Sequence, residues 1–178
     1  MKHRQYYTDN HSDPEFFSGI GTEIFKEAIK EIIYCTDSKT LLDYGSGKGY
    51  QYTNLKFHEY WEVDVDMYDF GVEGIDVLPD KSYDGVIALR LLDLVPEDEL
   101  DEVLTNIFAR AKKFVFIALH NLPPRKYFPD GKHIGVTLEP LQWWEEKIKP
   151  YNTKGVDLEI TTVLKHIKEW NLEIPTEL

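Results

Sequence analysis

Short apolar runs alternate with amphipathic segments along most of the chain. Four runs have the composition of strands, and they cover residues 41–42, 60–64, 83–89 and 114–119. The run at 41–42 is typical of a strand buried on both faces, and the run at 83–89 also indicates a buried strand. Apolar residues recur at helical spacing in three other segments, which cover residues 22–34, 96–111 and 139–148. Strands that alternate with helices in this way predict an α/β protein with a doubly wound, Rossmann-like sheet.

The last part of the chain has a different pattern. Apolar and polar residues alternate from Val156 to Thr162, as they do in a half-exposed strand, and a further short strand is expected from Trp170 to Ile174. The sequence contains no internal repeat, no low-complexity segment and no linker. We therefore expect one domain that spans residues 1–178.

The first strand leads into three glycines at alternate positions, Gly45, Gly47 and Gly49. A strand that passes through a glycine-rich turn into a helix, here expected over residues 50–57, is typical of nucleotide-binding sites. The spacing excludes a dinucleotide fingerprint, because Tyr50 and Tyr52 occupy the positions of its last glycine. It also excludes a phosphate-binding P-loop, which needs serine or threonine directly after the lysine. A tight turn without a ligand is the remaining alternative.

An acidic residue further along the chain favours a ligand. Asp64 ends the second apolar run, roughly 20 residues beyond the first glycine, where a carboxylate that binds ribose is expected. Two features at the expected separation therefore predict a nucleoside-containing cofactor.

The stretch from Leu41 to Gly49, with Asp43 ahead of the glycines, resembles the first motif of class I S-adenosylmethionine-dependent methyltransferases. The resemblance extends over most of the chain and implies that S-adenosylmethionine is the cofactor. It also implies a mostly parallel sheet with an antiparallel strand near the C-terminus. The cofactor-binding residues that it implies are Asp43, Tyr44, Gly45, Ser46, Gly47, Gly49, Asp64, Val65, Asp66, Asp76, Arg90 and Leu91.

The resemblance assigns different parts of the cofactor to these residues. The backbone of the glycine turn contacts the methionine part, Asp64 or Asp66 binds the ribose, and Asp76 binds the adenine amino group. The match is closest to small, largely uncharacterised methyltransferases of bacteria and phages. These proteins contain short sequence motifs similar to Phe16-Phe17-x-Gly19, Pro129-Asp-Gly131 and Trp143-Trp144.

Methyl transfer requires an acceptor, and some acceptors require a base. His120 directly follows the strand of residues 114–119, and His133 lies in the long loop after it, so both are candidate catalytic residues. Many relatives have a glutamate-histidine pair where this chain has Asp93-Leu94. No histidine and carboxylate have the spacing of metal ligands, so we expect no metal.

Two segments are expected to cover the site, namely an N-terminal arm of residues 1–20 and a substrate-side loop of residues 120–138. The loop carries Arg125, Lys126 and Lys132, which favour an anionic acceptor. The expected acceptor is a small molecule or a glycan-like compound.

The composition adds limits on partners and location. The formal net charge of −12 makes a nucleic-acid substrate unfavourable. The chain has no stretch that reads as a signal peptide or a membrane span, and its single cysteine, Cys35, fits a reducing cytoplasm. A cofactor-binding domain without catalytic activity, such as a sensor or a subunit, and a nucleic-acid methyltransferase remain alternatives. The sequence leaves the oligomeric state open.

Overall fold

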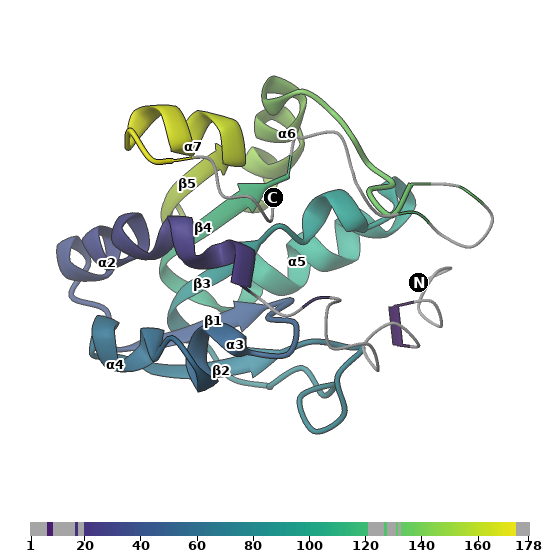
Figure 1. The fold of residues 1–178 in the computed structure, drawn as a ribbon. Coiled ribbons are helices and arrows are strands. Elements are labelled where there is room, and N and C mark those ends of the chain that lie inside the picture. Colours follow the sequence, from purple (N-terminus) through teal and green to yellow (C-terminus); the bar gives the residue numbers. More distant parts are fainter. Residues whose placement is uncertain are drawn as a thin grey trace.

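The computed structural model describes residues 7–8, 17, 20–120, 127, 131 and 133–173. Its centre is a sheet of five parallel strands in the order β2-β1-β3-β4-β5 (Figure 1). The strands are β1 (Thr40–Tyr44), β2 (Asp64–Tyr68), β3 (Tyr83–Leu89), β4 (Ala111–Leu119) and β5 (Asp157–Thr162). The prediction of an α/β fold with a doubly wound sheet is confirmed.

Helices cover both faces of this sheet (Figure 1). The helices α5 and α6 pack on one face, and the 3₁₀ helix η1 packs on the other with α2, α3, α4 and α7. The α-helices on these faces are α2 (Lys26–Cys35), α3 (Tyr50–Thr53), α4 (Phe57–Trp61), α5 (Leu100–Arg110), α6 (Leu141–Ile148) and α7 (Val163–Glu169). The 3₁₀ helices are η1 (Ile20–Phe25), η2 (Leu92–Leu94), η3 (Glu97–Glu99) and η4 (Lys149–Tyr151).

Burial on both faces explains why the strands are continuous apolar runs. Leu42 of β1 belongs to the core beneath α5, whereas its neighbour Leu41 belongs to the core beneath α2. In β4, Val115 belongs to the core beneath α5 and Phe116 to the core beneath α2. Because successive side chains of a strand point to opposite faces, most positions in a central parallel strand are apolar.

The expected antiparallel strand near the C-terminus is wrong. β5 pairs in parallel with β4, from Phe114 opposite Asp157 to Leu119 opposite Thr162. The chain then forms α7, because Val163 and Ile167 lie four residues apart and both pack into the core. Residues 170–173 form a turn and an irregular segment instead of the expected strand, and residue 174 lies outside the described residues.

The second strand lies later in the sequence than expected. Tyr60 and Trp61 belong to α4, and the Trp61 indole is buried against Phe57 with its Nε1–H donating to the Lys26 carbonyl. Residue Glu62 has a left-handed φ of 57° and ends this helix. β2 therefore begins at Asp64, the residue at which the prediction had ended it.

The helix expected over residues 50–57 is likewise divided into α3 and α4, because Lys56 has a left-handed φ of 54°. No helix in the described part of the chain is both long and apolar enough to cross a membrane.

The pH dependence of stability tests how α7 packs. His166 is buried between Phe25 and Trp170, and burial lowers the pKa of its imidazole below the ordinary 6.5. The folded state disfavours the protonated ring, so this contribution to the free energy of unfolding is present above pH 6.5 and is lost as the pH falls through the lowered pKa. Denaturant titrations between about pH 7.5 and about pH 5 measure this loss.

The control is His166→Gln, whose amide N–H can still donate to the Ile24 carbonyl, 2.9 Å from His166 Nε2, but does not titrate. We expect the stability of this variant to fall less than that of the wild type as the pH decreases. An identical pH dependence in both proteins would contradict the prediction.

Candidate functional site

The strand order reverses between β1 and β3, since β2 lies beyond β1 on one side and β4 beyond β3 on the other. Ligands of doubly wound sheets bind outside the carboxyl ends of the strands at such a reversal. Here β1 passes into the glycine turn, and β3 passes into Arg90 and Leu91. The Leu91 side chain lies directly on Gly45, where an added Cβ would be 2.7 Å from Leu91 Cδ2. The structure therefore brings the predicted residues Gly45 and Leu91 together.

The three glycines of the turn adopt backbone conformations that other residues avoid. Their φ angles are 85° at Gly45, 59° at Gly47 and 71° at Gly49. The N–H groups of Gly45 and Ser46 donate to the Tyr68 carbonyl over 2.7 and 3.1 Å. The turn is thus held against the end of β2 by its own backbone.

Asp43, at the centre of the motif, is turned toward α3. Its Oδ2 accepts hydrogen bonds from Gln51 Nε2 at 2.9 Å and from the Tyr52 hydroxyl at 2.7 Å. Gln51 Nε2 also donates to the Ser46 carbonyl, 3.0 Å away. Burial raises the pKa of Asp43 to about 6, even though both donors favour the ionised form. Asp43 joins β1 to α3 and so shapes the turn, while its contact with a cofactor stays a prediction.

Asp69 lies beside the glycine turn, although the sequence did not single it out as a candidate. It directly follows β2, and its Oδ2 accepts the Gly47 N–H at 2.9 Å while its Oδ1 accepts the Gly71 N–H at 2.9 Å. Its side chain is buried. The misplaced end of β2 concealed this residue, and correct recognition of the helix at Tyr60 and Trp61 would have revealed it.

The structure does not bring the other predicted acidic residues to the turn. Asp64 lies at the amino end of β2, opposite Thr40, and is exposed. Asp66 forms an ion pair with Lys81 Nζ at 2.8 Å and accepts the Tyr83 hydroxyl at 2.6 Å. Asp76 is exposed in the loop after β2. Their predicted contacts with ribose and adenine are not supported by these positions.

Two further predicted residues have side chains in the core. Val65 packs with the helices on the α2 face, and Tyr44 is buried on the α5 face with its ring 4.8 Å from that of Tyr68. Ser46 is also buried, and its hydroxyl lies 3.3 Å from the Gly47 carbonyl oxygen. At the turn, the backbones of Tyr44 and Ser46 are therefore better suited than their side chains to contact a ligand, whereas Val65, opposite Leu41, lies toward the other end of the strands.

A second group of polar residues lies at the ends of β3 and β4. The His120 backbone N–H donates to Asp93 Oδ1 over 3.3 Å, and burial raises the pKa of Asp93 to about 6. The Asp93 carbonyl accepts the N–H groups of Val136 and Thr137 at 2.9 and 3.1 Å. Asp93 thereby joins the end of β4 to the substrate-side loop.

An aromatic cluster connects the N-terminal arm to this loop. The Tyr7 hydroxyl donates to the carbonyls of Leu94 at 2.9 Å and Ile134 at 3.2 Å. The Tyr7 ring lies 5.6 Å from the ring of Phe17 and 6.0 Å from that of Phe70. The described residues of the arm and of the loop therefore pack on each other beside the carboxyl ends of the strands.

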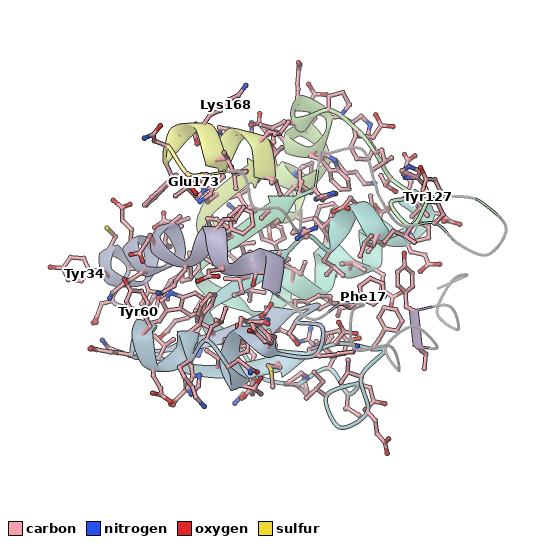
Figure 2. All side chains as sticks on the ribbon, viewed as in Figure 1. Phe17, Tyr34, Tyr60, Tyr127, Lys168 and Glu173 are labelled. Atoms are coloured by element: carbon pink, nitrogen blue, oxygen red, sulfur yellow. The ribbon has the colours of Figure 1, made fainter. Side chains whose placement is uncertain are left out.

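Phe17 also contacts the glycine turn. Its carbonyl accepts the Lys48 N–H at 3.0 Å, and a Cβ added to Gly47 would overlap this carbonyl oxygen. Figure 2 shows Phe17 and Tyr127 on the side of the molecule where the strands end and Tyr34 on the opposite side. The ring of His133 lies 4.8 Å from that of Tyr127. Arg125, Lys126 and Lys132 lie outside the described residues.

In the described part of the chain, no three His, Cys, Asp or Glu side chains are grouped to hold a metal ion. No protein-family model matches the sequence, and no curated protein matches it. Among solved structures, the chain is similar to a SAM dependent methyltransferase from Archaeoglobus fulgidus. The identity is 19%, the match covers 79% of this chain and 72% of that chain, and the TM-score is 0.44. Similarity at this level does not establish a shared function.

Replacing Tyr52 tests the support of the turn. Tyr52→Phe removes a donor from the buried Asp43 carboxylate, and loss of a bond to a buried charged group should reduce the free energy of unfolding by about 1.5–3 kcal/mol. Tyr60→Phe is a matched control, because the Tyr60 hydroxyl donates to an exposed carboxylate, that of Glu27. This control should change stability by less than about 0.5 kcal/mol. Chemical denaturation measures both values, and equal losses would refute the role assigned to Asp43.

Proposed function

We propose that this protein is an S-adenosylmethionine-dependent methyltransferase that acts on a small-molecule or glycan-like acceptor. The observation that carries the proposal is the hydrogen bond from the Gly47 N–H to Asp69, which places an acidic side chain beside the glycine turn at the end of the neighbouring strand. A nucleoside cofactor needs both parts, a backbone that it can approach closely and a carboxylate for its ribose hydroxyls.

Asp69 is the proposed ribose ligand in place of Asp64. Asp69 accepts the backbone N–H groups of Gly47 and Gly71, and these two bonds would hold its carboxylate beside the turn, where a ribose hydroxyl is expected. Its position after β2 is the one that the resemblance had assigned to Asp64. The backbones of Gly45 and Ser46 would then face the methionine part of the cofactor.

The strand order does not indicate which cofactor binds, because several ligand-binding α/β folds share it. The sequence of the glycine turn is what favours one cofactor. Its glycine spacing excludes the dinucleotide fingerprint and the P-loop, and it resembles the methyltransferase motif.

The cofactor and the protein would each supply part of what the reaction needs. S-adenosylmethionine supplies the methyl group and the leaving group when bound, and the protein holds the acceptor in line and excludes water. His120 lies beyond β4 on the proposed acceptor side, where its imidazole could take a proton from the acceptor. Asp93 fixes the backbone of His120 and is a positioning residue. Turnover of any acceptor, detected as S-adenosylhomocysteine, would exclude a domain that only binds the cofactor.

The glycine turn gives a direct test of cofactor binding. Gly47→Ala would place a methyl group against the Phe17 carbonyl, so the turn proposed to bind the cofactor would have to shift. We expect the affinity for S-adenosylhomocysteine, measured by calorimetry, to fall by more than about 100-fold, or about 2.8 kcal/mol.

Gly155→Ala is the matched control, because Gly155 has a similar φ of 66° but has open space where the methyl group would lie. This variant should lose about 1–2 kcal/mol of stability from backbone strain and keep its affinity. Failure of the folded wild type to bind the cofactor or its demethylated product would disprove the proposed function.

The assignment of the ribose ligand is tested by a pair of variants. Asp69→Asn keeps an oxygen for one of the two backbone N–H groups, turns its NH2 toward the other and removes the charge. Affinity for S-adenosylhomocysteine should therefore fall about 10- to 100-fold. Asp64→Asn should bind as the wild type does, since Asp64 is exposed at the other end of β2. The opposite ranking of the two variants would restore Asp64 as the ligand.

A further inference from the structure

Arg90 occupies an unusual place at the strand reversal. It is the first residue after β3, and its backbone has a left-handed φ of 57°, which residues with side chains rarely adopt. Its N–H donates to the Ala118 carbonyl of β4 at 2.7 Å, which holds this conformation. Strained backbone of this kind persists where the surrounding structure fixes it, and it is concentrated at ligand sites.

The Arg90 side chain lies against a glycine in the helix η1. A Cβ at Gly21 would overlap Arg90 Nη1 and lie 3.1 Å from Cζ. Gly21 is not among the glycines with left-handed φ, so its backbone conformation does not require glycine. The Arg90 guanidinium fills the space that a side chain at position 21 would need, and this explains the glycine there. The glycine at position 21 and the left-handed backbone at Arg90 together allow the Arg90 side chain to lie here.

The guanidinium is largely enclosed but has no partner in the described part of the chain. It makes no hydrogen bond and no ion pair with residues 20–120, 133–173 or the other described residues. Burial lowers the pKa of Arg90, and the negative charge of Asp93 only partly offsets this. Asp93 Oδ1 instead accepts the His120 N–H. Enclosed arginines are normally paired, because five N–H donors without acceptors are costly to bury.

We propose that Arg90 binds an anionic group, a carboxylate or a phosphate, of a ligand at the β1–β3 reversal. The planar guanidinium suits such groups because it donates two parallel hydrogen bonds to them. The backbone of Arg90 lies beside the glycine turn, since the side chain of Leu91, the next residue, lies on Gly45. The inference rests on the proposed function for the identity of that ligand. The anion is either the amino-acid carboxylate of the cofactor or a negative group of the acceptor.

The first experiment tests anion binding without a cofactor. Thermal unfolding of the whole protein is compared in phosphate, in acetate and in chloride of equal ionic strength at one pH. A bound anion stabilises the folded state by mass action, so phosphate or acetate should raise the Tm of the wild type more than chloride does. Arg90→Met should lose this increase, with an apparent Kd for the anion at least about 10-fold higher.

Two further variants make the result specific. Arg110→Met is the matched control, because Arg110 already donates to the carbonyls of Pro79 and Asn106 and should not contribute to the response. Gly21→Ala keeps the charge but displaces the guanidinium, so it should weaken the response as Arg90→Met does. It also serves as a second test if Arg90→Met folds poorly.

The second experiment identifies the source of the anion. Calorimetry compares S-adenosylhomocysteine with 5′-methylthioadenosine, which lacks the amino-acid carboxylate. If Arg90 binds the cofactor carboxylate, Arg90→Met weakens the first ligand about 10- to 100-fold and leaves the second unchanged. If it binds the acceptor, both affinities stay unchanged while the response to phosphate or acetate is lost.

The outcomes separate this inference from the proposed function. If Arg90→Met leaves the anion response and both affinities unchanged, or if Arg110→Met loses them equally, the inference is wrong. If the wild type binds no S-adenosylhomocysteine but its anion response depends on Arg90, the anion site stands and the proposed methyltransferase function fails.

Discussion

The register between β1 and β2 is the constraint on which the candidate site depends. Tyr44 pairs with Tyr68, so the residues that follow them, Gly45 and Asp69, emerge at the same level of the sheet. The Tyr68 carbonyl accepts the Gly45 N–H, and Asp69 then accepts the Gly47 N–H. Because side chains alternate between faces along a strand, a shift of one residue would exchange the apolar side chains of β2 between the two cores. Core packing therefore fixes the register, and the register places an acid beside the glycine turn.

Charge is distributed unevenly around this turn. The protein has a formal net charge of −12, yet Arg90 is enclosed at the strand reversal without a carboxylate in hydrogen-bond contact among the described residues. A surface of this sign attracts a sulfonium cation at long range, whereas the guanidinium offers a local position for an anion. S-adenosylmethionine carries both charges, and Asp69 and Arg90 lie after strands on either side of β1.

The fold and the glycine turn could be predicted from local patterns, whereas the partner of the turn could not. The apolar runs of β3 and β4 and the spacing of Gly45, Gly47 and Gly49 are visible in the sequence alone. Trp61 misled the strand assignment, since an aromatic residue suits a strand and a buried helix equally well. The parallel direction of β5 and the Gly21–Arg90 contact depend on the packing of distant segments, which periodicity does not encode.

The positions of the buried carboxyl groups support a functional interpretation of this edge. Asp43 and Asp93 are both raised to a pKa of about 6 by burial, and they lie at or beyond the ends of β1 and β3. A raised pKa means that the folded state favours the protonated form, so each group stabilises the fold less at pH 7 than at pH 5. Selection for stability alone would favour neutral side chains at such places. Buried carboxyl groups kept at such a cost, one of which, Asp93, interacts with the charge of Arg90, are typical of a site whose charges serve a ligand.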